Sequence, residues 1–335
     1  MSDYEMSLLY VIRNGFELNQ DYYKCPDNET LWKKSVKRPY SGSYFVGSTA
    51  VIITFYILCL IAIASSDRMK TSAYKMMIML GIMDIVCLLG AMGAEGVLAI
   101  LGATLCTFPF WTFATGSITL GSWLGSCASS IALAATRVCD LNPQLKLKKV
   151  IEGRGIYIIM FLISLYAFYG TFLTNPCFFS PEHGYWLFDP LLGKDPNLYV
   201  SYIHSGNNLF MTGSTSLIYG YLAFLVWKQS VLANSTNSSS TKKRILLQCF
   251  FLCFFHITTS LLYIYMQYFY SPLILNFIAT ISLQISNSSA CFVYIVLNQT
   301  IRKSVVALFL PKSILKNNTS VGIQMTSQQR SSHIE

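Results

Sequence analysis

The sequence predicts an all-α membrane protein whose chain crosses the bilayer seven times. Its apolar stretches are each roughly 20 residues or longer, the length that crosses a hydrocarbon core as a helix. In lipid, only a helix or a closed barrel satisfies the backbone polar groups. Hydrophobic residues make up 53% of the chain and charged residues 12%, whereas a soluble domain carries about 25% charged residues. These observations exclude an ordinary soluble fold.

The apolar stretches divide the chain into an N-terminal segment (1–42), a seven-helix bundle (43–297) and a tail (298–335). The tail is expected to begin with a short amphipathic helix, Thr300–Leu310, at the membrane interface and to end in disorder. The Ser/Asn-rich stretch Lys228–Arg244 predicts a flexible loop. The seven helices are predicted at Ser43–Ala64, Tyr74–Ala94, Pro109–Thr136, Gly155–Thr174, Gly206–Trp227, Ile245–Tyr268 and Pro272–Leu297.

The Lys and Arg residues predict the orientation, because cytoplasmic loops carry the excess of positive charge. Basic residues cluster in alternate loops and in the tail, and the opposite loops hold only Lys194. The N-terminal segment is itself basic, so the first helix alone is ambiguous, but the other loops place the N-terminus outside. The net charge of +9 is therefore mostly a topology signal. It predicts contact with membrane lipids and no nucleic-acid partner.

Three of the ten cysteines, Cys25, Cys106 and Cys177, fall on the predicted outer side. That compartment is oxidising, so one disulfide is plausible there. A bridge between Cys106 and Cys177 would hold the long outer loop over the mouth of the bundle, and Cys25–Cys106 is the alternative. The spacing does not decide between them. The sequon at Asn28 predicts outer glycosylation, and no Cys/His spacing predicts a metal site.

Asp84 is the most informative polar residue inside a predicted helix. An ionised carboxylate at mid-membrane is costly unless paired, so Asp84 is predicted to face the bundle interior, with Asn287 of the seventh helix as a candidate partner. The side chain is either a conformational switch or a satisfied structural group. Leu80, one turn earlier, gives the spacing of the second helix of rhodopsin-like receptors, and that likeness suggests a sodium ion near Asp84. Glu95 is expected at the outer interface.

A ligand pocket is expected in the outer half of the bundle, where pockets combine apolar walls with a few polar groups. The alternative is that these residues form the aromatic belt or pack between helices. The candidate pocket residues are Trp111, Asn207, Asn208, Tyr263, Gln267 and Asn276.

Two helix ends carry a family resemblance. Arg137 ends the third helix like the Arg of the rhodopsin-like Asp-Arg-Tyr signature, but Thr136 precedes it and Asp140 follows. In the seventh helix, Ala290-Cys291-Phe292-Val293-Tyr294 stands where rhodopsin-like receptors have Asn-Pro-x-x-Tyr. These departures resemble nematode serpentine chemoreceptors of class T, as do four further motifs: Gly81–Asp84, Trp186–Pro190, His204–Asn208 and Leu297–Arg302.

The resemblance implies a rhodopsin-like seven-helix architecture in the plasma membrane of sensory neurons. It implies a small-molecule ligand and a heterotrimeric G protein, with Arg137 and Asp140 at the coupling face and Asp84, Asn287 and Tyr294 in a polar switch. It also favours Cys106–Cys177, the usual bridge of seven-helix receptors. The missing acid before Arg137 leaves the usual inactive-state ion pair in doubt.

Two other functions remain open. A small-solute transporter usually shows internal repeats and broken helices, and no repeat is visible here. A ligand-silent pseudoreceptor or scaffold is compatible with the same sequence. An enzyme is not expected, because no second buried carboxylate or nucleophile is placed to work with Asp84, and no cofactor is expected beyond the sodium ion.

Overall fold

The computed structural model describes residues 2–27, 36–232 and 236–309. Within them, seven segments are long and apolar enough to cross a membrane, which confirms the predicted bundle. The spans are α5 (Pro39–Ala64), the continuous run Ser72–Leu101, α8 (Pro109–Leu141), α10 (Gly155–Phe172), α11 (Tyr202–Leu232), α12 (Thr236–Tyr268) and α13 (Leu273–Leu297).

The second span is longer than predicted and is not one regular helix. It consists of α6 (Ser72–Leu88), a π-helical turn η2 (Leu89–Ala94) and α7 (Glu95–Leu101). Gly102 ends it in a left-handed conformation, with φ of 66°, which glycine adopts without strain. The extra turns carry Glu95 into the bundle, where its side chain is 1% exposed. The interfacial position expected for Glu95 is therefore wrong.

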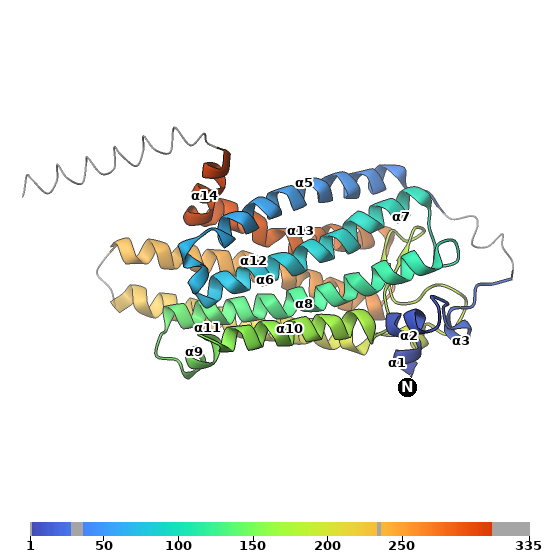
Figure 1. Ribbon diagram of the computed structural model, residues 1–335, viewed down its shortest axis with the longest axis horizontal. Helices are drawn as coiled ribbons and strands as arrows, with labels where there is room; N and C mark the ends of the chain where they lie inside the picture. Colours follow the sequence, from blue (N-terminus) through green and yellow to red (C-terminus); the bar gives the residue numbers. More distant parts are fainter. Residues whose placement is uncertain (1, 28–35, 233–235, 310–335) are drawn as a thin grey trace, which may run out of the picture.

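The flexible loop predicted at Lys228–Arg244 is also wrong over its described residues. Helix α11 continues to Leu232 and α12 begins at Thr236, so the Ser/Asn run lies largely in helix. The stretch contains neither Gly nor Pro, and Ser and Asn disfavour a helix interior only mildly. Two neighbouring helices can therefore extend past the apolar region (Figure 1).

Helix α8 is the central helix of the bundle and the most buried span. It packs against α6, α10 and α11, and small residues allow these close approaches. A Cβ atom on Gly121 would lie 2.5 Å from the carbonyl oxygen of Ala167 in α10. A Cβ on Gly116 would overlap the carbonyl of Cys177 in the outer loop. The outer loop is thus seated directly on the backbone of α8.

The N-terminal segment folds onto the outer end of α8. Among its described residues the short helices are α1 (Ser2–Glu5), α2 (Leu8–Arg13) and α3 (Gln20–Tyr23). The ring of Tyr23 packs edge-on against Phe113 of α8, with centroids 5.3 Å apart, and against Phe178 of the outer loop at 5.7 Å. Burial raises the pKa of the Tyr23 phenol well above its usual value, so this hydroxyl stays protonated.

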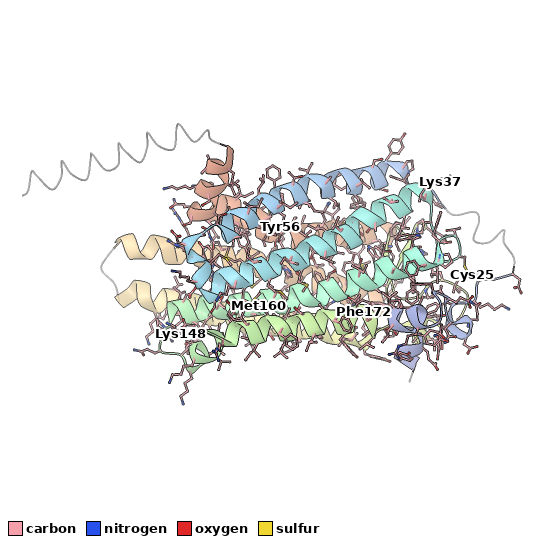
Figure 2. All side chains as sticks on the ribbon, in the orientation of Figure 1. Cys25, Lys37, Tyr56, Lys148, Met160 and Phe172 are labelled. Atoms are coloured by element: carbon pink, nitrogen blue, oxygen red, sulfur yellow. A yellow bond between two sulfur atoms is a disulfide. The ribbon has the colours of Figure 1, made fainter. Side chains whose placement is uncertain are left out.

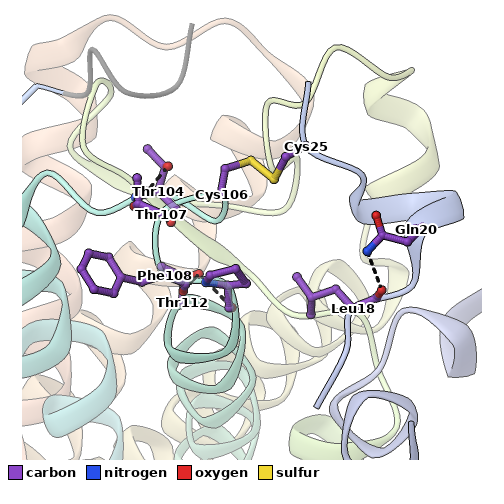
Figure 3. Close-up of a disulfide and its surroundings, with 9 residues drawn as sticks. Leu18, Gln20, Cys25, Thr104, Cys106, Thr107, Phe108 and Thr112 are labelled. Carbon is purple, nitrogen blue, oxygen red and sulfur yellow. Dashed lines mark hydrogen bonds between the residues drawn. A yellow bond between two sulfur atoms is a disulfide. The ribbon is translucent and has the colours of Figure 1, made fainter. Parts of the chain in front are cut away.

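The disulfide joins Cys25 to Cys106 (Figure 3). The favoured Cys106–Cys177 pairing is therefore wrong, and its alternative is present. Cys177 is a free, buried cysteine whose thiol donates to the carbonyl of Gly116 at 3.3 Å. Gly116 lies seven residues beyond Pro109, where α8 begins, so Cys177 sits roughly 10 Å deeper along the helix than Cys106. That depth exceeds the reach of a disulfide.

A two-stranded hairpin, β1 (Phe178–Ser180) and β2 (Tyr185–Leu187), covers the mouth of the bundle. Arg38, at the start of α5, donates to the carbonyls of Pro181 and Glu182 in its turn at 2.6 and 2.7 Å. Gly184 closes the turn with φ of 69°. The N-terminal segment, with its helices α1–α3, and the hairpin thus together cover the outer end of the bundle.

The opposite end of the molecule carries α9 (Lys146–Ile151) and α14 (Gln299–Phe309). Helix α14 follows the bundle closely, near the predicted Thr300–Leu310. Lys148 lies at this end, and Cys25 and Lys37 lie at the other (Figure 2). The glycosylation candidate Asn28 and the predicted disordered end of the tail lie outside the described residues.

Candidate ligand site and polar core

A deep cavity of about 40 Å³ lies beneath the hairpin. Its floor and walls come from α6, α8, α11, α12 and α13, and the hairpin supplies its roof. No charged side chain lines it, and two tryptophans and a phenylalanine give it a largely aromatic wall. The lining residues are Cys87, Thr119, Leu120, Trp123, Cys177, Trp186, Phe188, His204, Tyr263 and Leu283.

A larger vestibule of about 360 Å³ lies above the deep cavity and shares Trp186, Phe188, His204 and Tyr263 with it. Its other walls are more polar and include His183, Asp189 and Gln267. Burial raises the pKa of the Asp189 carboxyl above its usual value. A polar entrance above an apolar chamber is the arrangement of a small-molecule site.

Two buried hydroxyl groups of the deep cavity have no hydrogen-bond partner. Thr119 is 5% exposed and its Oγ1 is unpaired. The hydroxyl of Tyr263 approaches Thr280, but the geometry makes no hydrogen bond. Buried polar groups are nearly always paired in folded proteins. Both residues line the deep cavity, so their hydroxyls are its candidate polar contacts for a bound molecule.

A chain of side-chain contacts runs from the cavity toward the middle of the bundle. His204 bonds Gln267 at 3.1 Å through Nδ1 and Asn208 at 3.0 Å through Nε2. Asn208 accepts the indole N–H of Trp123 at 2.9 Å. The Trp123 ring stacks on His256 of α12, with centroids 5.8 Å apart and the planes 10° from parallel.

This series of side-chain contacts ends at Asp84, whose side chain is fully buried. His256 Nε2 lies 3.4 Å from the hydroxyl of Ser126, which donates to Asp84 Oδ1 at 2.5 Å. Tyr56 of α5 donates to Oδ2 at 2.5 Å. Because each carboxylate oxygen already accepts a hydroxyl hydrogen, the arrangement favours a hydrogen-bonded core. It gives the expected sodium ion no support.

The seventh helix does not supply the partner predicted for Asp84. Asn287 donates to the Leu283 carbonyl of its own helix at 2.9 Å, and its Oδ1 is unpaired. The buried hydroxyl of Tyr294 is also unpaired. The partners are instead Tyr56 and Ser126, which a single sequence does not single out. Tyr and Ser are common in apolar helices, and helix rotation decides which of them meet.

The predicted pocket residues fall into three groups. Tyr263 and Gln267 line the cavity and the vestibule. Asn207 and Asn208 lie behind the wall, where Asn207 accepts the hydroxyl of Tyr166 at 3.2 Å, and Asn276 donates to the His183 carbonyl of the hairpin turn at 3.4 Å. Trp111 is wrong as a pocket residue, because it is 65% exposed on the outside of α8. An aromatic residue near a helix end can line a pocket or lie at the membrane interface, and Trp111 takes the outward position.

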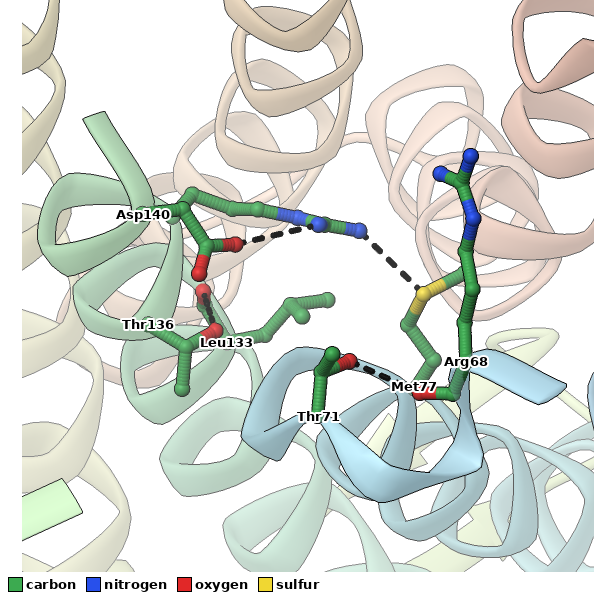
Figure 4. Close-up of polar contacts among 7 residues, drawn as sticks. Arg68, Thr71, Met77, Leu133, Thr136 and Asp140 are labelled. Carbon is green, nitrogen blue, oxygen red and sulfur yellow. Dashed lines mark hydrogen bonds and ion pairs between the residues drawn. The ribbon is translucent and has the colours of Figure 1, made fainter. Parts of the chain in front are cut away.

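At the inner end of α8, Arg137 forms an ion pair with Asp140 at 3.4 Å and donates to the sulfur of Met77 at 3.3 Å (Figure 4). The Arg137 side chain is 12% exposed and that of Asp140 is 46% exposed. The acid that follows the arginine by one helical turn thus replaces the absent acid before it. The pair lies at the end of the bundle opposite the hairpin.

Comparisons with known proteins agree with this architecture. Residues 6–318 match the family model described as "Serpentine type 7TM GPCR chemoreceptor Srt". The chain is also 23% identical to Serpentine receptor class T-55 of Caenorhabditis elegans over 309 residues, which cover 91% of this chain and 83% of that receptor. Because the family match extends over nearly the whole chain, the protein belongs to the Srt family of serpentine seven-transmembrane chemoreceptors.

Proposed function

We propose that this receptor binds a small molecule in the deep cavity and activates a heterotrimeric G protein at its inner end. The observation that carries the proposal is the cavity itself, with its two unpaired hydroxyls and a continuous series of contacts to Asp84. The family match supports a receptor at the level of fold. The plasma membrane of a sensory neuron is the location that fits a chemoreceptor.

The lining favours an uncharged and mainly apolar or aromatic ligand. An ion in this chamber would lose its water without meeting an opposite charge. Thr119 offers one hydrogen bond at the wall between α6 and α8, and Tyr263 offers another from α12. A ligand with one or two polar atoms on an apolar frame uses both.

The mechanism is a shift between two arrangements of the bundle. A ligand that binds one arrangement better increases its population by that difference in affinity. Trp123 lines the cavity and stacks on His256, so a ligand that displaces the indole also disturbs the contact between His256 and Ser126. At the inner end, release of Arg137 from Asp140 makes the guanidinium available to the G protein.

The test is a screen of small volatile and water-soluble metabolites on cells that express the chain with an extracellular N-terminal tag. The readout is ligand-dependent G-protein activation. Arg137→Ala is expected to abolish activation while ligand binding persists. Thr119→Val keeps the side-chain shape and removes the hydroxyl, so it is expected to raise the half-maximal ligand concentration about five- to tenfold.

Thr54→Val is the matched control, because Thr54 is exposed on α5 and bonds only its own helix at Ala50. It should leave the response unchanged. A response that survives Arg137→Ala would contradict the coupling role of Arg137. A response that is equally affected by both threonine variants would contradict the proposed site. Silence at verified surface expression would favour a transporter or a pseudoreceptor.

A further inference from the structure

We propose that a second cavity, beside Glu95, binds a small molecule that carries a protonated amine. This cavity of about 60 Å³ lies between α5, α7, α13 and the hairpin and shares no lining residue with the deep cavity. Its lining includes Arg38, Phe45, Glu95, Phe179, His183 and Phe277. The site goes beyond the proposed ligand site, and its binding does not depend on G-protein coupling.

Glu95 has no ion-pair partner among the described residues. Its Oε2 accepts the indole N–H of Trp186 at 2.8 Å, and within the described residues Oε1 receives no hydrogen bond and no Lys, Arg or His forms an ion pair with it. A carboxylate has about four acceptor sites. Ionisable groups inside a bundle almost always pair or face a functional cavity. Glu95 faces a cavity.

Arg38 lines the same cavity but is committed elsewhere. Its Nε and one terminal nitrogen donate to the carbonyls of Pro181 and Glu182, so the guanidinium holds the hairpin turn. Arg38 keeps its charge but forms no ion pair with Glu95, so a direct hydrogen-bonded ion pair with the carboxylate is left to a molecule that enters the cavity. An ammonium group supplies both the positive charge and up to three N–H donors.

The remaining walls suit the same group. Phe45 and Phe179 are buried, and Phe277 adds a half-exposed ring from α13. Aromatic faces attract cations, by about 0.5–2 kcal/mol per contact, and an ammonium–carboxylate hydrogen bond is about twice as strong as a neutral one. A carboxylate among phenylalanine rings thus selects an ammonium over a neutral or anionic group.

Trp186 connects the two sites. Trp186 lines the deep cavity, and its N–H donates to both Glu95 and the Ala91 carbonyl. An ammonium that takes part of the Glu95 carboxylate competes with this indole. Occupation of the second cavity therefore changes the wall of the first.

The test compares three molecules of one shape and different charge on purified receptor: phenethylammonium, phenethyl alcohol and phenylacetate. Binding is measured from the ligand-dependent rise in melting temperature. Phenethylammonium is expected to bind at least tenfold more tightly than the alcohol, and phenylacetate more weakly than both. Glu95→Gln is expected to remove the preference for the ammonium.

Glu152→Gln is the matched control, because Glu152 lies at the inner end and pairs with Lys148 at 3.4 Å. It should keep the preference. Equal affinity for ammonium and alcohol in the wild type, or a preference that persists in Glu95→Gln, would overturn the proposal. If Glu95→Gln does not fold, Phe179→Leu keeps the carboxylate and removes a ring. It should weaken the ammonium more than the alcohol, and equal weakening would overturn the site.

Discussion

Asp84 and Glu95 lie on the same transmembrane span and are both almost completely buried, yet their carboxylates are satisfied in different ways. Both oxygens of Asp84 accept hydroxyl groups from neighbouring helices. Glu95 accepts one indole N–H and faces a cavity. The first carboxylate is completed by the protein, and the second is left open to another molecule.

The π-helical turn between them explains why they meet different neighbours. In an unbroken α-helix, residues 84 and 95 would lie on nearly the same face, since eleven residues make about three turns of 3.6. The turn at Leu89–Ala94 has wider i→i+5 bonding and changes this phase. Asp84 therefore faces α5 and α8, and Glu95 faces the hairpin, the start of α5 and α13. Such turns occur frequently at functional sites.

The comparison teaches that burial alone does not assign a role to an intramembrane carboxylate. What separates the two is the set of donors that the fold brings to each oxygen. We expect substitutions at Asp84 to act first on stability and on the switch, and substitutions at Glu95 to act on binding.

The largest effect is expected from Asp84→Ala, which leaves the buried hydroxyls of Tyr56 and Ser126 without an acceptor. Each unsatisfied group costs about 1–3 kcal/mol, so the melting temperature of purified receptor should fall sharply. Asp84→Asn keeps an acceptor and a donor that a rotated hydroxyl can meet. It should alter G-protein activation more than surface expression.

Equal stability loss in Asp84→Ala and Glu95→Ala would break the contrast between the two sites. A collapse of surface expression in Asp84→Asn would make Asp84 a structural group and not a switch.

Asp140→Asn extends the comparison to a third carboxylate, whose partner Arg137 lies on its own helix. The pair is partly exposed, so its loss costs about 0.5–1 kcal/mol. If the pair stabilises the resting arrangement, basal G-protein activation should rise about two- to fivefold. Glu152→Gln, which removes the ion pair with Lys148, should leave basal activation unchanged. A fall in basal activation would show that the pair supports the active arrangement.

Glu95→Gln is expected to lower the stability of the ligand-free receptor by less than about 1 kcal/mol, because the glutamine oxygen still accepts the Trp186 N–H. The melting temperature should therefore change only slightly. This small effect separates a site that awaits a ligand from one that the fold has completed. A loss as large as that of Asp84→Ala would show that Glu95 holds the hairpin and would count against an open site.

The sequence predicts the bundle well because bilayer thickness dictates the length of each apolar run. The prediction fails where a charged residue lies inside a span. The second helix is predicted to end before Glu95, whereas the helix continues through Leu101. The prediction fails again at Lys228–Arg244, where composition predicts a loop and the absence of Gly and Pro allows helix.

The site is less predictable, for reasons of geometry. The burial of Asp84 follows from the energetics of charge in lipid. Its partners Tyr56 and Ser126 depend on helix rotation, and so does the separation of Trp111 from the pocket. The Cys25–Cys106 bridge depends on the depth at which Cys177 meets α8, which no spacing along the chain records.

The smallest effect concerns Cys177, which reports the charge of Glu95. Burial raises the pKa of this thiol to about 12, and a negative charge on Glu95 would raise it further. Maleimide labelling of Cys177 should therefore be slow at neutral pH and accelerate as the pH rises, because the thiolate is the reactive form. In Glu95→Gln the pKa should fall and labelling at a given pH should rise about two- to threefold.

Cys177→Ser provides the background from the other cysteines, and Glu152→Gln again serves as the distant control. Unchanged labelling in Glu95→Gln would mean that Glu95 carries no charge in the empty cavity. The ammonium would then have to bind with release of the carboxyl proton, and its affinity should rise with pH until Glu95 is ionised. Faster labelling would mean that the carboxylate is already charged and that the ammonium meets a preformed countercharge.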